Sequence, residues 1–374
     1  MKKKQLFYLI ILIPLVLIYI LFLKKKSNKI SKFIKTPISA NSVVIFELND
    51  YHLECLPGFT KYFTDLGFNA DIIIRYNRSD SMERFEPKDK IQIFEYKDEK
   101  ELIHYQKELK KKFRKYNYSL LQSIDQIKNK LKIYKKLGYY DNPKSLFVVH
   151  HTDFIKKMKI DKFISKKHAF GLADYGILTY LNPNYFGNFN HTHKKNNKIS
   201  FYISSSVDKY YSYLILAVKN LKKKMIEFEI NITGHSNDLS LDIIPPELRK
   251  YFFFHGRVSY RKLYQVIQNS DFIILNLYPD KIIDNIFRTF RATGSAQLAY
   301  GFYKPVIIEE NFAPIYKFSN ETAIIFKNHD LSYGLERATK ISSKEYFQMS
   351  KKIKYLRETI YNISLNNLKN ALNQ

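Results

Sequence analysis

The chain has 374 residues, of which 45% are hydrophobic and 16% aromatic. That length fits about two domains, and that composition excludes a disordered chain, a fibrous repeat and a small disulfide-stapled module. The single cysteine, Cys55, excludes an internal disulfide framework and a cysteine-rich zinc site. The net charge of +27 attracts phosphates, nucleic acid or anionic lipid, and the charge alone does not distinguish between these partners.

The first 26 residues have the pattern of a transmembrane anchor with basic flanks. Residues 6–23 carry no charge, and as a helix they would reach about 27 Å, close to the thickness of the hydrocarbon core of a bilayer. A cleaved signal peptide is the competing interpretation, but lysines at 24–26 stand where cleavage requires small residues. The flank after the span has more basic residues than the flank before it, which favours a body on the cytoplasmic side. The sequence does not decide on which side of the membrane the body lies.

The N-terminal half has the pattern of an α/β domain. After a polar linker at 27–41, a strand at 43–46, a helix at 56–66 and a strand at 70–74 follow one another closely. Such a β-α-β unit predicts a parallel sheet whose functional loops lie at the carboxyl ends of the strands. Further strands are expected at 91–94 and 146–149.

Residues 98–138 are expected to form one long helical stretch in which lysines flank the apolar positions. Two interpretations of its basic face stay open. The face is either a solvated surface, or it lies on the anionic headgroups of a membrane that the anchor brings close.

A second series of alternating strands and helices begins at residue 199, after a polar stretch at 182–198. His191 and His193 in that stretch have no third ligand nearby, so we interpret them as solvated and predict no metal site. The sequence thus predicts two Rossmann-like, doubly wound α/β domains that face each other across a cleft. The expected parts are an N-terminal domain at 42–185, a linker at 186–198, a C-terminal domain at 199–352 and a helical tail at 353–374.

Histidines and carboxylates follow two strands of the N-terminal domain. His151 and Asp153 come after the strand at 146–149, and His52 comes after the first strand, with Glu54 beside it. Histidine transfers protons near neutral pH, and a carboxylate orients it or accepts a proton. The sequence therefore predicts His151, Asp153 and His52 as catalytic acid/base candidates, with a structural role for the histidines as the alternative.

Two blocks in the C-terminal half resemble the GT-B type glycosyltransferases. Residues 254–260 (FHGRVSY) with the pair SD at 270–271 are similar to a strand, glycine-containing loop, helix and next strand of that fold. Residues 295–301 (SAQLAYG) with KP at 304–305 are similar to its following helix and turn. The resemblance covers most of the chain after the anchor. It implies a nucleotide-sugar donor bound mainly by the C-terminal domain and an acceptor bound mainly by the N-terminal domain.

The start of the helix in the second block is the main candidate for binding the donor diphosphate. Thr293, Gly294 and Ser295 give it a small, unhindered backbone, whose free N–H groups can hold phosphate without a metal. A serine cap with a glycine turn is the plainer interpretation. Arg288 and Arg291 precede this start, and a guanidinium matches phosphate oxygens. The resemblance places further donor contacts in strand-end loops, at Ser205, Ser206, Gly234, Gly256, Arg257 and Val258.

With this resemblance, the sequence predicts a membrane-anchored glycosyltransferase that moves a sugar from a nucleotide-sugar donor to a hydroxyl of a glycan, lipid-linked or protein acceptor. No cofactor or metal is required. Ala296 and Gln297 stand where the retaining branch of the family has a glutamate, so the stereochemistry stays open. The same departure supports an alternative, a non-catalytic, membrane-tethered binding protein of this fold in glycan assembly. A nucleic-acid binder is disfavoured because the usual motifs are missing from the sequence.

Overall fold

The computed structural model describes residues 29–49, 52–124, 128–139, 142–152, 168–189, 198–204, 211–234, 243–279 and 282–373. The predicted anchor at 1–26 lies outside these residues. Among the residues that the structure describes, none of the helices combines the length and the apolar character needed to cross a bilayer.

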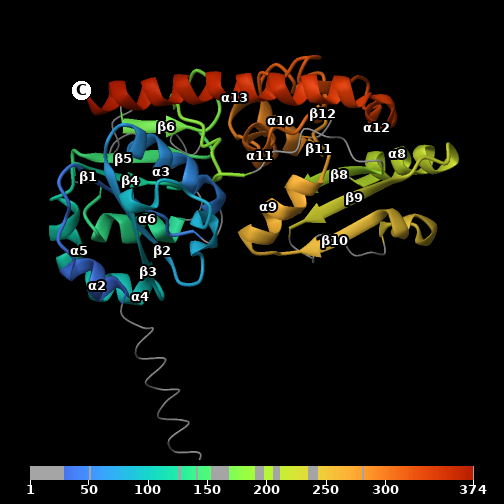
Figure 1. Ribbon diagram of the computed structural model, residues 1–374. Coiled ribbons are helices and arrows are strands. Elements are labelled where there is room, and N and C mark those ends of the chain that lie inside the picture. The colour runs from blue at the N-terminus through green and yellow to red at the C-terminus, as the bar shows by residue number, and fades with distance from the viewer. Residues whose placement is uncertain are drawn as a thin grey trace, which may run out of the picture.

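Within the described residues, the N-terminal domain contains a parallel sheet of seven strands in the order β3-β2-β1-β4-β5-β6-β7 (Figure 1). Strands β1 and β5 are buried along their whole length, as expected for a parallel sheet covered on both faces. The strands are β1 (Ser42–Phe46), β2 (Asn69–Arg75), β3 (Ile91–Tyr96), β4 (Tyr118–Leu121), β5 (Ser145–Val149), β6 (Ala169–Gly171) and β7 (Thr179–Tyr180). The helices are α2 (Lys29–Lys35), α3 (Leu56–Asp65), α4 (Glu99–His104), α5 (Gln106–Phe113) and α6 (Lys128–Lys136), with short 3-10 turns η1 (Leu53–Cys55), η2 (Ser79–Met82) and η3 (Lys88–Lys90).

Alternate side chains of β1 belong to different cores because successive residues of a strand point to opposite faces of the sheet. Val43 and Ile45 pack in one core with side chains of α3. Val44 and Phe46 pack in the other with side chains of α2 and α5. Since both faces are covered, the loops at the carboxyl ends of the strands remain to form the functional edge.

The expectation of one long helical stretch at 98–138 is wrong. Three helices occur there, and Tyr118–Leu121 between them is strand β4. This strand lies in the middle of the sheet, paired with β1 and β5. Its four residues are too few to interrupt the helical spacing of the apolar residues around them, and its pairing partners are far away in sequence. Pairing within the sheet therefore overrides the local pattern.

The C-terminal domain confirms the prediction of a second doubly wound domain. Its described part contains a parallel sheet of six strands in the order β10-β9-β8-β11-β12-β13. The strands are β8 (Ile199–Ser204), β9 (Phe228–Thr233), β10 (Phe252–Gly256), β11 (Phe272–Ile274), β12 (Val306–Glu309) and β13 (Ala323–Phe326). The helical segments are α8 (Tyr211–Lys223), η8 (Pro246–Tyr251), α9 (Tyr260–Asn269), α10 (Ile282–Thr289), α11 (Gly294–Phe302), α12 (Leu331–Lys340) and α13 (Ser343–Leu372).

Helix α13 is 30 residues long and runs along both domains (Figure 1). At its start, the Tyr346 hydroxyl donates to the backbone oxygen of Asp271 in the C-terminal domain, at 2.9 Å. At its end, Leu368 is buried in an N-terminal core, and the Tyr118 hydroxyl donates to the backbone oxygen of Leu372 at 2.6 Å. The predicted tail at 353–374 is therefore the second part of a helix that packs against both domains.

The described part of the predicted linker is packed rather than loose. Phe186 is buried and stacks on Phe302 of α11, with ring centroids 5.6 Å apart. A side chain at Gly301 would clash with Phe186, because a Cβ there would lie 2.2 Å from the ring. The glycine of the block at 295–301 thus allows the linker to pack against α11. His191 and His193 lie outside the described residues.

Candidate active site

Three buried polar side chains lie at the carboxyl ends of neighbouring strands in the N-terminal domain. Glu47 follows β1, Ser123 follows β4 and His150 follows β5. The Ser123 hydroxyl donates to Oε2 of Glu47 at 2.6 Å and lies 3.0 Å from Nε2 of His150. Because the strands are parallel, residues distant in sequence meet at this edge of the sheet. Together these three side chains form a buried, hydrogen-bonded polar cluster at the edge of the sheet.

His52 and Glu54 lie next to this polar cluster, with His52 in contact with His150. The imidazole of His52 lies on that of His150, with ring centroids 4.1 Å apart, and its Nδ1 is 3.4 Å from Oε1 of Glu54. The two side chains remain partly accessible, at 26% for His52 and 19% for Glu54. His52 also has a left-handed backbone, with φ of 69°, a conformation that costs energy in a residue other than glycine. An accessible imidazole beside a carboxylate is the arrangement of a general base and its orienting group.

The surroundings of these groups set different charge states. Burial alone would raise the pKa of the Glu54 carboxyl, but the hydrogen bond and charge of His52, with smaller help from a backbone N–H and Tyr260, outweigh it and lower the pKa. Burial, followed by the charge of His52, holds the pKa of His150 well below its usual range. At neutral pH Glu54 is therefore ionised and His150 is neutral. His52 thus has a carboxylate on one side and an uncharged ring beneath it.

Across the cleft, helix α11 begins with an accessible backbone. The N-cap residue, Thr293, makes no side-chain capping hydrogen bond. The hydroxyl of Ser295 lies 3.0 Å from that of Ser204 at the end of β8. A Cβ built at Gly294 meets no heavy atom of the described chain within 4 Å. The start of α11 is thus exposed at Gly294, between the buried Thr293 and Ser295, and a helix start with free N–H groups attracts phosphate.

Two further loops predicted to contact the donor lie against each other. The backbone N–H of Gly234, after β9, donates to the backbone oxygen of Gly256, at the end of β10, at 3.0 Å. Gly256 has φ of 64°, in the left-handed region that favours glycine, and a Cβ there would point into open space among the described residues. Arg257 is exposed and Val258 half-buried beside it. These loops lie side by side at the carboxyl ends of β9 and β10.

The two predicted arginines have different environments. Arg291 is half-buried, its guanidinium lies 5.2 Å from the centre of the Phe287 ring, and its charge contributes to lowering the pKa of His150. The backbone of Arg291 pairs with that of His151 in an isolated antiparallel bridge. Arg288 is exposed, with a hydrogen bond of 3.5 Å to Asn285 on its own helix. Arg291 is therefore the better phosphate candidate of the two.

The two halves of the site touch each other directly. Thiol Sγ of Cys55, at the start of α3, lies 3.7 Å from Oε1 of Gln297 on α11. The backbone N–H of Thr152 donates to the backbone oxygen of Phe290 at 3.0 Å. These contacts bring the His52–Glu54 pair and the start of α11 to the same part of the cleft.

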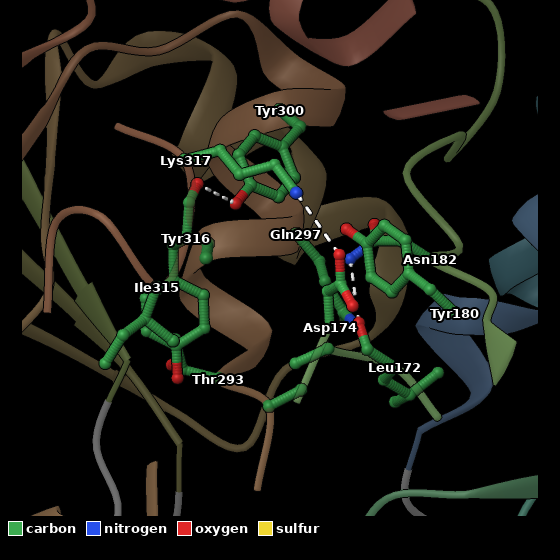
Figure 2. Close-up of a pocket in the computed structure, with 13 residues that line it drawn as sticks. Leu172, Asp174, Tyr180, Asn182, Thr293, Gln297, Tyr300, Ile315, Tyr316 and Lys317 are labelled. Atoms are coloured by element: carbon green, nitrogen blue, oxygen red, sulfur yellow. Dashed lines mark hydrogen bonds and ion pairs between the residues drawn. The ribbon is translucent and has the colours of Figure 1, made fainter. Parts of the chain in front are cut away.

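A cavity of about 10 Å³ lies beside this contact, between the two domains (Figure 2). It is lined by Asn182, just after β7, and by Thr293 and Gln297 of the α11 region, with an ion pair of 3.3 Å between Lys317 and Asp174 at its side. A space of this size holds a single water molecule and is too small for a sugar or a nucleotide. This cavity is therefore not the donor or acceptor site.

The structure places six of the fourteen predicted site residues near the contact between the two domains. His52 and His151 lie on the N-terminal side of the cleft, and Arg291, Thr293, Gly294 and Ser295 lie on the other. Asp153, Ser205 and Ser206 lie outside the described residues. Sequence reasoning missed Glu47 and Ser123. Recognition of β4 would have revealed Ser123, since the residue would then follow a strand. Among the described residues, no group of three side chains suited to holding a metal occurs.

The chain is similar in structure to glycosyltransferases of GT-B type. A glycosyltransferase from Rickettsia africae ESF-5 matches with a TM-score of 0.58 and 15% identity, over 89% of this chain and 98% of that chain. The Anabaena protein HepE, solved in complex with UDP and glucose, matches with a TM-score of 0.55 and 9% identity, over 89% of this chain and 100% of that chain. No protein-family model and no curated protein matches the sequence. The similarity confirms the GT-B type fold, with two Rossmann-like domains.

Proposed function

We propose that the protein is a glycosyltransferase that moves a sugar from a nucleotide-sugar donor to a hydroxyl of a glycan, lipid-linked or protein acceptor. One observation carries this proposal. The partly accessible His52–Glu54 pair at a strand end of one domain lies close to the open start of α11 in the other, within a GT-B type fold. A base and an anion-binding helix start are the two elements that this transfer requires.

The C-terminal domain binds the donor. Backbone N–H groups at the start of α11 and the guanidinium of Arg291 face the diphosphate, and the loops of Gly234 and Gly256 approach the nucleoside. Negative charge develops on the leaving phosphate oxygen as its bond to the sugar breaks. Fixed N–H dipoles and a guanidinium stabilise that charge without a metal ion.

The N-terminal domain activates the acceptor. His52, in its neutral form, accepts the proton of the acceptor hydroxyl while the hydroxyl oxygen forms a bond to the anomeric carbon of the donor sugar. The bond from that carbon to the phosphate oxygen breaks, and the oxygen keeps the electron pair. Glu54 is ionised and stabilises the imidazolium that forms, and neutral His150 beneath the ring adds no opposing charge.

Substitution of Gly294 tests the phosphate site. Gly294→Val is expected to weaken the binding of UDP, used as the probe, by about 1.5 to 3 kcal/mol, the value of one charge-assisted hydrogen bond. A Cβ at this position meets no heavy atom of the described chain within 4 Å, and the valine side chain would cover the N–H groups that approach phosphate. Calorimetry on the full-length chain in detergent measures the affinity, and thermal unfolding serves as the control. Equal affinity in the variant and the native chain would remove this helix start from the donor site.

Residues 1–26 anchor the protein in a bilayer in this proposal. The described chain begins at α2, whose end is fixed to the domain by the buried Lys112, because its ammonium donates to the backbone oxygen of Thr36 at 2.5 Å. The lysines of α5 lie beside this point, so the body would face the membrane with a basic surface. The full-length protein is expected to stay with the membrane during carbonate extraction. Its recovery in the supernatant would contradict the anchor.

A non-catalytic binding protein in glycan assembly is the second candidate. Gln297 supports it, because this side chain is buried and its Nε2 has no hydrogen-bond partner among the described residues, where a carboxylate would be expected in the retaining branch. The two candidates differ in one result. The binding protein binds nucleotide and consumes no nucleotide sugar, whereas the enzyme binds nucleotide and consumes a nucleotide sugar.

A further inference from the structure

Tyr260 belongs to the C-terminal domain but packs against the cores of both domains. It is the first residue of α9 and follows the loop of Gly256, Arg257 and Val258 after only Ser259. Its half-buried ring packs against one core of the C-terminal domain and one core of the N-terminal domain. Tyr260 therefore links the proposed donor loop to the opposite side of the cleft.

The hydroxyl of Tyr260 donates to Oε2 of Glu54 at 3.3 Å. Burial, with the charge of Glu54 as the next cause, raises the pKa of Tyr260 well above its usual value, so the phenol stays protonated and remains a donor. Each carboxylate oxygen of Glu54 thus contacts a different domain. Oε1 lies 3.4 Å from His52 of its own domain, and Oε2 accepts from Tyr260 of the other.

Two more carboxylates of the N-terminal domain hold the start of α9. Oδ2 of Asp80 accepts from the backbone N–H of Tyr260 at 2.6 Å, and Oε2 of Glu83 accepts from Nε of Arg261 at 2.7 Å. A carboxylate at a helix start satisfies a free N–H and opposes the positive end of the helix dipole. The Arg261–Glu83 pair is exposed and contributes little stability. The buried end of this contact is the hydrogen bond to Glu54.

We propose that Tyr260 is a positioning residue for the His52–Glu54 pair. Its hydroxyl fixes the orientation of the Glu54 carboxylate, so the pair reaches its working geometry only while the two domains are closed on each other. The inference rests on the proposed function for the role of His52, and it adds that the domain binding the donor completes the base in the domain binding the acceptor. Opening of the cleft would remove the Tyr260 hydroxyl and leave the carboxylate able to rotate.

Other described ionisable groups near the His52–His150 pair follow β5, follow β1 or precede α11. His150, after β5, is in ring contact with His52, and Glu47, after β1, reaches His150 through Ser123. Arg291, before α11, and His151, after β5, act electrostatically on His150. Glu54 is a carboxylate that the described part of the structure places in direct contact with His52, at 3.4 Å. A change in the titration of His52 on removal of the Tyr260 hydroxyl is therefore expected to pass through Glu54.

The test is the titration of His52 by nuclear magnetic resonance, on the full-length chain in detergent with ¹⁵N-labelled histidine and no nucleotide. The variant His52→Asn assigns the signal. Glu54→Gln is expected to shift the titration midpoint of His52 to lower pH, because the imidazolium loses its counter-charge. Tyr260→Phe is expected to shift it in the same direction, since the carboxylate is no longer held. The double variant is expected to show no further shift beyond Glu54→Gln.

Tyr264→Phe is the matched control on the same helix. Its hydroxyl is buried and has no hydrogen-bond partner among the described residues, so its removal should leave the His52 titration unchanged. A native midpoint in Tyr260→Phe, or equal shifts in both Tyr→Phe variants, would overturn the inference. Because no nucleotide is present, these results do not depend on activity. A chain that consumes no nucleotide sugar would contradict the proposed function and leave the measured coupling in place.

Discussion

His52→Asn is expected to lower the turnover of a nucleotide sugar by about 100-fold or more, the usual contribution of a positioned general base. Asparagine is chosen because it tolerates the left-handed backbone of this residue. The affinity for the nucleotide should change little, since His52 belongs to the N-terminal domain, which we propose binds the acceptor. Steady-state kinetics and calorimetry on the same preparation separate the two effects.

His151→Asn is the matched control for this experiment. His151 was the first candidate from the sequence and His52 the second, but the structure holds the backbone of His151 against Arg291 and gives the ring contact with His150 to His52. Turnover should fall much less in His151→Asn than in His52→Asn. The opposite order would move the role of the base to His151, and native turnover in both variants would remove both histidines from the mechanism.

Arg291→Ala is expected to weaken UDP binding by about 1.5 to 3 kcal/mol, which corresponds to about 10- to 100-fold in affinity. The guanidinium is half-buried beside the start of α11, so in the proposed site it would pair with the diphosphate in surroundings that screen charge less than water does. Calorimetry with UDP measures the loss on the full-length chain.

Arg288→Ala is the control, because it removes the same charge from an exposed position on α10. Its effect on UDP affinity should be small and should vanish at high salt, where exposed charges are screened. Equal losses in the two variants would show that only the overall charge of the surface matters. A native affinity in Arg291→Ala would remove this arginine from the phosphate site.

The fold was predictable wherever local pattern and final structure agree. The β-α-β unit that begins at 43–46 and the alternation after residue 199 have strong apolar runs bounded by turn residues, and both occur as expected. Strand β4 was not predictable, because its four residues continue the helical spacing on either side and become a strand only by pairing with β1 and β5. Helix α13 was predictable as a helix, but its contacts with both domains depend on tertiary structure.

The site was predictable to the same extent. Residues that follow a recognised strand could be named in advance, which gave His52 and His151, and the small residues at 293–295 indicated the start of α11. Which of the adjacent His150 and His151 turns inward could not be read from the sequence, because β5 ends at Val149 just before them. Tyr260 could not be assigned either, since its partner Glu54 is a carboxylate of the other domain, 206 residues away.

The most direct test of the proposed function is the consumption of nucleotide sugars by the full-length chain. Purified protein in detergent is incubated with a panel of UDP-, GDP-, ADP-, dTDP- and CMP-linked sugars, and the released nucleotide is measured by mass spectrometry. The proposed function predicts that at least one donor is consumed by the native chain, with release of its nucleotide, and that His52→Asn consumes that donor about 100-fold more slowly. Consumption of no donor, with nucleotide binding intact, would contradict the enzyme and leave the binding protein.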